Sequence, residues 1–433
     1  MTFSSPVIDV LGIGFGPANL ALAIALEELA PHLSITFLER RPGPFWQPNM
    51  LLPSSDIQNH PLRDLVTPRN PRSRYSFTNF LFEQGRLYEH LNLPLHYPLR
   101  EEYAQYVTWA ASFFADRVVY GCEAKSVALM RPHEGDSHYH VTCADGRVLR
   151  ARALVLAPGR TPHVPAPFAG LADSRIRHLN DYLPALAESV AATGGRCRVA
   201  VIGGSQSAVE ILLHASEQSG VHEVVGFTRN FGYRQKDTSP FSDEVYFPAF
   251  VDTFYRANPE QKARLRRELV HTNYSAADID VLNQLYVRRY EQSLRGESRL
   301  QLRMCEEIQA CRPSAGHVEI ESRHYLEGNH HRQSFDLVVL ATGFLDLGQG
   351  ERQEPFPPLL AALVGENTRD GLSIQRDYRI DLASGQPVYL NGLCESSHGM
   401  GDAGSFSLLA LRSKAIVESL ARHLAATEPV DHD

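Results

Sequence analysis

The chain has 433 residues, of which 43% are hydrophobic and 21% are charged, and its formal net charge is -8. This length exceeds what one hydrophobic core needs, so we expect two or three domains, and the apolar content excludes a disordered chain. The acidic balance argues against a protein that binds nucleic acid or an anionic membrane, because such proteins carry a basic surplus. Since the sequence has no apolar run of about 18 residues and no signal-peptide pattern, we expect a cytoplasmic protein.

The first predicted element is a buried strand, PVIDVLGIG, over residues 6–14. A helical pattern begins at Pro17, and a second strand, SITFLER, carries Glu39 near its end. A strand, a glycine turn and a helix open a dinucleotide-binding unit, because glycines such as Gly12 and Gly14 let a pyrophosphate approach the helix N-terminus. Glu39 is placed to bind ribose hydroxyls and to repel a 2′-phosphate. The first site therefore favours FAD or NAD over NADP.

A second unit follows the strand RVAVIGG and precedes the helical pattern SQSAVEILLHASE. Its candidate phosphate-binding residues are Gly204, Ser205, Gln206 and Ser207. The next strand, EVVGFTRN, ends at a basic residue, Arg229, which can pair with a 2′-phosphate. We predict that the second site prefers NADPH.

Two similar turns, Ala157-Pro158-Gly159 and Ala341-Thr342-Gly343, end further apolar runs. Such turns recur where flavoproteins with two dinucleotide sites cross between domains. The predicted fold class is α/β, with two Rossmann-like domains and a small helical substrate-binding region.

The domain boundaries follow from the same pattern. We expect residues 1–190 to form the first part of an FAD-binding domain, and 191–335 an NADPH-binding domain with a helical insert at about 239–298. Residues 336–433 are expected to return to the FAD domain and to end in an amphipathic helix, with only the final EPVDHD loose.

The six cysteines show no CxxC pair and no zinc-like spacing. We expect reduced, mostly buried thiols and no metal site. The lack of two close cysteines in the sequence also excludes a disulfide reductase.

Several longer segments carry a more specific signal, among them GIGFGPANLALA, LRDLVTPRNPRSRYSFTNFL, VIGGSQSAVE, SPFSDEVYFP, HTNYS and HGMGDAGSFSLLALR. With these segments the chain resembles the N-hydroxylating flavin monooxygenases, the ornithine and lysine N-hydroxylases of siderophore biosynthesis, over almost its whole length. The resemblance implies that NADPH reduces FAD and that reduced FAD captures O2 as a C4a-hydroperoxide. The distal oxygen then passes to a neutral primary amine and gives a hydroxylamine. The resemblance also implies a homo-oligomer, often a tetramer.

The resemblance assigns site residues by position. FAD is assigned to Gly12, Gly14, Pro17 and Glu39, with Trp46, Gln47 and Gln58 along the flavin and Asp402 in a loop that closes over it. NADPH is assigned to Gly204, Ser205, Gln206, Ser207 and Arg229. The amine substrate is assigned to Gln58, Arg63, Asp243, Asn273 and Ser407. None of these acts as an acid or base, because the flavin and NADP carry the chemistry.

Two of these positions depart from the family pattern. Arg63 stands where the family has lysine, and it still offers a cation that binds a carboxylate in a bidentate manner. Asp243 stands where the family has asparagine, and it favours an ammonium or guanidinium group. The predicted substrate is therefore ornithine or a close relative. Aspartate, lysine, arginine or a diamine remain alternatives, as do a Baeyer–Villiger or sulfur-oxidising monooxygenase and, from another class, a non-catalytic flavin-binding redox sensor.

Overall fold

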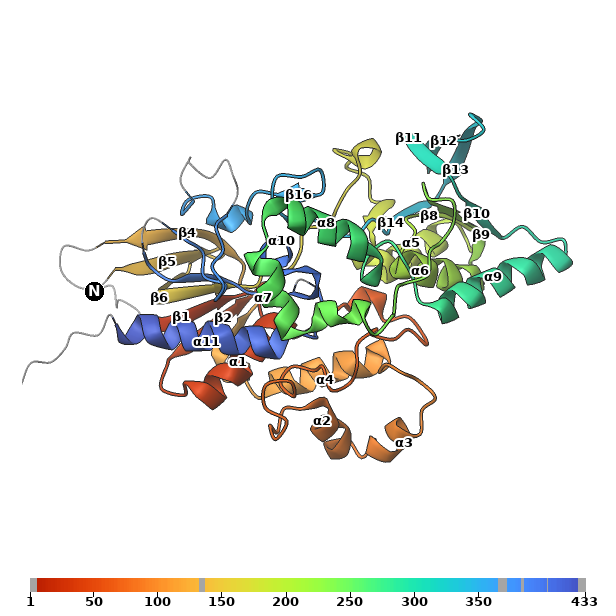
Figure 1. Ribbon diagram of the computed structural model, residues 1–433. Coiled ribbons are helices and arrows are strands. Elements are labelled where there is room, and N and C mark those ends of the chain that lie inside the picture. The colour runs from red at the N-terminus through yellow and green to blue at the C-terminus, as the bar shows by residue number, and fades with distance from the viewer. Residues whose placement is uncertain (1–5, 132–136, 365–371, 383–384, 403, 427–433) are drawn as a thin grey trace, which may run out of the picture.

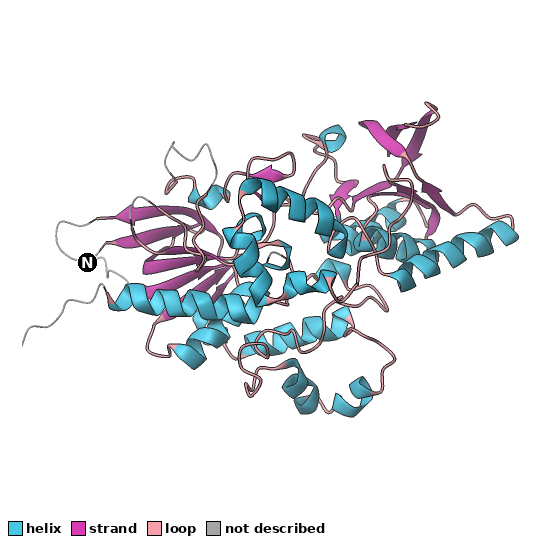
Figure 2. Cartoon of the chain, in the orientation of Figure 1, coloured by secondary structure: helices cyan, strands magenta, loops and turns pink. Residues whose placement is uncertain are grey.

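Two sheets, one mixed and one parallel, are built around the two glycine turns, and each contains the strand predicted before its turn. The computed structural model describes residues 6–131, 137–364, 372–382, 385–402 and 404–426. The two sheets occupy opposite ends of an elongated molecule, with most helices between and below them (Figures 1 and 2). The final EPVDHD, expected to be loose, lies outside the described residues.

The first sheet has the strand order β3-β2-β1-β6-β5-β4, and β17 pairs with β6. Its strands are β1 (Val7–Ile13), β2 (Ile35–Glu39), β3 (Val118–Tyr120), β4 (Ala124–Met130), β5 (His138–Cys143), β6 (Val148–Leu156) and β17 (Val388–Leu390). β1 pairs in parallel with β2 and β6, whereas β5 pairs antiparallel with β4 and β6. The predicted first strand is confirmed, and β5 and β6 form an antiparallel hairpin in the same sheet.

The second sheet is parallel throughout, in the order β10-β9-β8-β14-β7. Its strands are β7 (Ile176–His178), β8 (Cys197–Ile202), β9 (Val221–Phe227), β10 (Leu300–Arg303) and β14 (Leu337–Leu340). Two smaller sheets are built from β11 (Glu306–Ser314), β12 (His317–His324) and β13 (His330–Phe335), and from β15 (Asp346–Leu347) and β16 (Gln353–Glu354). The α/β class with two Rossmann-like sheets is as predicted.

The helices cover the sheets and fill the space between them. They are α1 (Pro17–Leu29), α2 (Phe77–Glu83), α3 (Leu87–Leu91), α4 (Arg100–Ser112), α5 (Tyr182–Ala192), α6 (Gln206–Glu217), α7 (Pro248–Arg256), α8 (Pro259–Leu269), α9 (Ile279–Leu294), α10 (Glu395–His398) and α11 (Leu409–Ala425). The segment expected to be a helical insert does hold α7, α8 and α9. None of the helices in the described residues combines the length and apolar character needed to cross a membrane.

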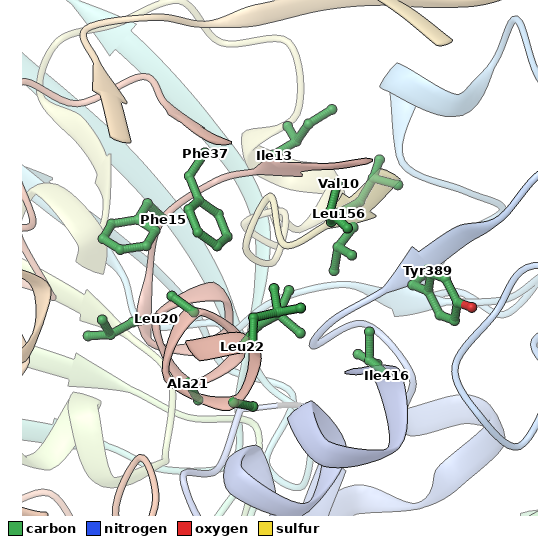
Figure 3. Packing of buried hydrophobic residues seen from close by; sticks show 14 of the residues in the cluster. Val10, Ile13, Phe15, Leu20, Ala21, Leu22, Phe37, Leu156, Tyr389 and Ile416 are labelled. Atoms are coloured by element: carbon green, nitrogen blue, oxygen red, sulfur yellow. The ribbon is translucent and has the colours of Figure 1, made fainter. Parts of the chain in front are cut away.

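The largest core joins α1 and α11 to the first sheet. All residues of α1 from Leu20 to Leu26 are buried, and α11 lies along α1 (Figure 1). Figure 3 shows Val10 of β1 and Leu156 of β6 above α1, with Ile416 of α11 beside Tyr389 of β17. Each such fully buried aliphatic side chain stabilises the fold by about 1.5–3 kcal/mol, so the last helix is part of the first domain's core. All six cysteines are buried and free, as the sequence predicts.

The chain crosses between the sheets twice, and the two crossing segments pair with each other. The amide N–H of His163 donates to the Gly343 carbonyl at 2.9 Å, and that of Leu345 donates to the Thr161 carbonyl at 2.8 Å. The crossing points therefore lie near residues 160 and 343, not at 190 and 335 as expected. The difference arises because β7 and β14 pair with each other in the second sheet. β7 precedes residue 190 and β14 follows residue 335, so both strands fall outside the expected NADPH-binding segment.

A buried polar chain links the C-terminal segment to the first glycine turn. Arg412 is fully buried, and its Nη1 lies 2.7 Å from Oδ1 of Asp402. Its Nε donates to Asn391 at 2.7 Å, the Asn391 amide donates to Asn19 at 3.0 Å, and Asn19 donates to the Gly14 carbonyl at 2.7 Å. Asp402 is thus the counter-ion of Arg412.

Removing the Asp402 carboxylate leaves the Arg412 guanidinium buried without a counter-ion. We expect Asp402→Ala to lower the free energy of unfolding by about 3–5 kcal/mol, measured by urea denaturation. Glu418 pairs with Lys414 on the exposed face of the same helix. Glu418→Ala is the control and should lower the free energy of unfolding by less than about 1 kcal/mol. Equal losses for the two variants would contradict this assignment.

Candidate active site

One cavity of about 1890 Å³ joins the two glycine turns. Sites for a single small ligand usually have about 300–1,000 Å³, so this cavity can hold more than one molecule. The predicted residues that line it are Gly14, Glu39, Trp46, Gln47, Gln58, Arg63, Gly204, Ser205, Gln206, Ser207, Arg229, Asp243, Asn273 and Ser407. Three predicted residues, Gly12, Pro17 and Asp402, do not line it. The structure thus brings most of the predicted set to one place, while the role of each residue stays a prediction.

The glycines of the first turn have three different tasks. A Cβ on Gly12 would lie 2.2 Å from the ring of Phe37, so Gly12 makes room for that ring, which Figure 3 shows beside the turn. Gly14 has φ +84°, and a Cβ there would lie 2.2 Å from the Ala157 carbonyl oxygen. Gly16 faces the cavity, and a Cβ there would meet no atom within 4 Å. The open approach for a phosphate is therefore at Gly16, which the predicted set omitted.

Pro17 and Glu39 hold the shape of this turn. Pro17 begins α1, where its missing N–H has no partner to lose, so its position is explained by helix initiation. The Glu39 carboxylate accepts the N–H of Phe15 at 2.8 Å and that of Arg41 at 2.9 Å. A carboxylate has about four acceptor positions, so Glu39 can still accept ribose hydroxyls.

The second turn repeats the same geometry. A Cβ on Gly203 would lie 2.3 Å from the Ala341 carbonyl oxygen. Ser205 precedes α6, whose N-terminus faces the cavity. The Gln206 side chain accepts the N–H of Asp278 at 2.8 Å and donates to Glu210 at 3.0 Å. Gln206 therefore ties α6 to the segment before α9.

Three arginines gather near the end of β9. Arg229 is exposed on the cavity wall, and burial together with Arg229 and Arg160 lowers the pKa of Arg352. Within the described part of the chain, neither Arg229 nor Arg352 has a carboxylate within 4.0 Å. Arg160 lies 3.9 Å from the Glu395 carboxylate, so Arg229 and Arg352 are the two of the three without a close counter-ion among the described residues, and such charges fit a polyanionic ligand. Arg352 and Arg160 come from the paired crossing segments, and no motif in the sequence indicates them.

A hydrogen-bonded chain connects the predicted substrate residues from two distant segments. The Ser407 hydroxyl donates to the side-chain oxygen of Asn59 at 2.9 Å. The side-chain amide of Asn59 in turn donates to the backbone carbonyl of Arg63 at 2.7 Å. The Arg63 guanidinium lies over the Tyr246 ring, 5.7 Å from its centroid. Arg63 is thus held by its backbone and by an aromatic face, which leaves its N–H groups for a ligand.

Asp243 lines the same region together with a lysine, Lys236, that the predicted set omitted. Burial raises the pKa of Asp243, and the nearby Lys236 and Arg63 act in the opposite direction. The Lys236 Nζ lies 3.5 Å from the side-chain oxygen of Gln58. Lys236 follows Arg234 in a loop without periodicity, so only the folded structure indicates its place.

A buried acid completes the wall near Asn273. The Tyr274 hydroxyl donates to the Glu395 carboxylate at 2.5 Å, and Arg160 donates to the Tyr274 oxygen at 3.2 Å. Burial, together with the nearby Asp346 carboxylate, raises the pKa of Glu395 to about 7. The wall can therefore hold or release a proton near neutral pH.

The aromatic part of the cavity lies where Trp46 packs edge-on against Phe406, with ring centroids 5.3 Å apart. Phe406 also packs against Tyr103 at 4.8 Å. Trp46 and Phe406 line the cavity, so this part of its wall is apolar.

Comparisons with known proteins agree on one family. A model described as L-lysine 6-monooxygenase/L-ornithine 5-monooxygenase matches residues 6–346. The L-ornithine N(5)-monooxygenase of Pseudomonas aeruginosa (strain PAO1) is 34% identical over 433 residues, which covers 98% of this chain and 96% of that protein.

Two solved structures have the same fold. The ornithine hydroxylase PvdA from Pseudomonas aeruginosa is 34% identical, with a TM-score of 0.86 and coverage of 97% of this chain and 100% of that chain. The ornithine N-hydroxylase KtzI from Kutzneria sp. 744 is 32% identical, with a TM-score of 0.86 and the same coverage. The KtzI structure is described with reduced FAD, NADP⁺ and L-ornithine.

Two of the glycines in the first turn, Gly12 and Gly16, predict different effects of an added methyl group. We expect Gly16→Ala to weaken FAD binding about tenfold or more, measured by flavin fluorescence, while the free energy of unfolding changes by less than about 0.5 kcal/mol. Gly12→Ala should instead lower that free energy by about 1–3 kcal/mol through the clash with Phe37. Loss of stability in Gly16→Ala without a binding defect would contradict the assignment.

Proposed function

This chain belongs to the L-lysine 6-monooxygenase/L-ornithine 5-monooxygenase family, and from that premise we propose that it N-hydroxylates the side-chain amine of ornithine or a close relative, with FAD and NADPH, for siderophore or related biosynthesis. The observation that carries the proposal is the single cavity that joins both glycine turns to Arg63 and Asn273. Both cofactors and the amine can therefore meet in one place.

The residues of each turn fit one cofactor. Gly16 leaves the space that the pyrophosphate of FAD requires, and the Glu39 carboxylate suits its ribose. The α6 N-terminus and the arginine group around Arg229 suit the phosphates of NADPH. Bound FAD and NADPH supply the electrons that let one oxygen atom of O2 join the amine while the other leaves as water. We accordingly assign the first sheet to FAD and the second to NADPH.

The residues between the turns position the amine. Arg63 offers a bidentate cation for the substrate carboxylate, and Asn273 and Ser407 line the same region. Such an anchor holds the far amine at a fixed distance and so reduces the entropy lost in reaching the reactive geometry. The amine must react in its neutral form, because an ammonium has no lone pair.

Two further features support a cytoplasmic location and an assembly of several copies of the chain. The six buried free cysteines suit a reducing compartment, the cytoplasm. The exposed Tyr286, Tyr290 and Leu294 along α9 suit an interface between copies of the chain, in keeping with the homo-oligomer that the resemblance implied.

The reaction is tested with purified, FAD-loaded protein and NADPH. Hydroxylamine formation and O2 uptake are measured with ornithine, lysine, arginine, aspartate, putrescine and cadaverine. We expect hydroxylamine from ornithine. Product from aspartate or a diamine alone would overturn ornithine as the substrate and support N-hydroxylation as the reaction. Peroxide without hydroxylated amine would overturn the whole substrate set, and no oxidation of NADPH would overturn the enzyme proposal in favour of a flavin-binding sensor.

The choice of NADPH is tested at Arg229. We expect Arg229→Ala to raise the KM for NADPH by about 10- to 100-fold, because one charge-assisted contact to the 2′-phosphate is lost. The KM for NADH, which lacks that phosphate, should change less than about threefold. NADH serves as the matched control in the same variant. Equal changes for the two nucleotides would mean that Arg229 does not read the 2′-phosphate.

A further inference from the structure

Lys236 lines the same cavity as Arg63 and is a second cation there. The predicted substrate residues do not include it. Its backbone N–H donates to the Ala277 carbonyl at 2.8 Å, and the neighbouring Gln235 pairs with Ala277 in an isolated bridge. Its Nζ lies 3.5 Å from the side-chain oxygen of Gln58, which also lines the cavity. The backbone contacts hold this loop in place, so Lys236 is presented to the cavity by the fold.

Three charges stand apart on this wall. In the residues that the structure describes, none of Arg63, Lys236 and Asp243 takes part in an ion pair within 4.0 Å. Each is half-buried, so each has lost part of its hydration without gaining an oppositely charged group within 4.0 Å among the described residues. Two separated cations and one carboxylate, all facing one cavity, form an arrangement that a ligand with complementary charges can complete.

Lys236 acts electrostatically on two acids, Asp243 and Asp278. Lys236 opposes the rise in pKa that burial causes in Asp243 on one side and in Asp278 on the other. Asp56 also lines the cavity, where burial and neighbouring acids raise its pKa to about 6. An isolated Asp243 would repel a substrate carboxylate, and Lys236 offsets that repulsion.

We propose that Lys236 and Arg63 together bind the α-carboxylate of the substrate while Asp243 binds its α-ammonium, so that this site selects zwitterionic α-amino acids over diamines and ω-amino acids. This inference rests on the proposed N-hydroxylation and specifies its substrate class. Asp243 then offers the α-ammonium a charged carboxylate, whereas the family's asparagine offers only a neutral amide. Lys236 is a specificity-determining residue.

Two analogues of ornithine separate the two contacts. Putrescine lacks only the carboxylate, and 5-aminopentanoate lacks only the α-ammonium. Binding of all three is measured by calorimetry on protein loaded with FAD and NADP⁺, so that the readout does not require turnover. Lys236→Met keeps the length of the side chain and removes its charge, and Asp243→Asn keeps the shape and removes the charge.

We expect Lys236→Met to weaken binding of ornithine and 5-aminopentanoate by about 10- to 100-fold and to leave putrescine unchanged within about threefold. Asp243→Asn should weaken ornithine and putrescine by a similar factor and leave 5-aminopentanoate unchanged or tighter. Lys236→Arg should retain most of the affinity for ornithine. Lys414→Met, on the exposed face of α11, is the control for a lost lysine charge and should change none of the three.

The outcomes separate this inference from the proposed function. If wild-type protein binds none of the three compounds, ornithine hydroxylation itself is overturned and the subsite with it. If ornithine binds but each variant loses all three compounds equally, Lys236 and Asp243 act only on the fold and the subsite is overturned. If ornithine binds and neither variant changes its affinity, the two residues do not face the substrate.

Discussion

At each glycine turn, an alanine carbonyl of a neighbouring strand end approaches the glycine backbone so closely that no side chain fits between them. The distances from an added Cβ would be 2.2 Å at Gly14 and 2.3 Å at Gly203. The two alanines, Ala157 and Ala341, begin the crossing segments, which are hydrogen-bonded to each other. The same backbone contact that shapes each turn therefore fixes where the chain leaves each sheet. Both turns consequently open into one cavity, and every assignment made for that cavity depends on this close approach.

The cavity is sorted by charge along its length. Guanidinium groups without close carboxylates gather near Arg229, where the second turn offers helix N–H groups. Opposite charges are mixed near Arg63 and Asp243, where a smaller ligand with both signs fits. Aromatic side chains such as Trp46 and Phe406 form an apolar part of the same wall, and a low local dielectric strengthens electrostatic contacts beside it. A nucleotide and an amino acid can thus occupy neighbouring regions without competing for the same groups.

The sequence predicted the elements that depend on local pattern. Both strand-turn-helix openings, the returning hairpin and the terminal helix were predictable, because burial on a sheet or beside a helix imposes a regular hydrophobic period. Residues carried by a motif also fell on the cavity wall. The tasks of single residues were less predictable, because they depend on partners far away in the chain. Gly12 makes room for Phe37 and Asp402 pairs with Arg412, and no motif in the sequence indicates either partner. Lys236 and Arg352 belong to loops without periodicity, and only tertiary structure brings them to the wall.

The polar chain from Arg412 to Gly14 has a consequence for the order in which the protein can form during synthesis. Its members lie between residue 14 and residue 412, and α11 supplies a face of the core that α1 also needs. A ribosome releases the N-terminal half first, yet the first Rossmann unit then lacks both β17 and the last helix. The second sheet, whose strands lie between residues 176 and 340, has all its pairing partners earlier. The unit that begins the chain is therefore the one completed last, and its apolar α1 stays uncovered until translation is nearly finished.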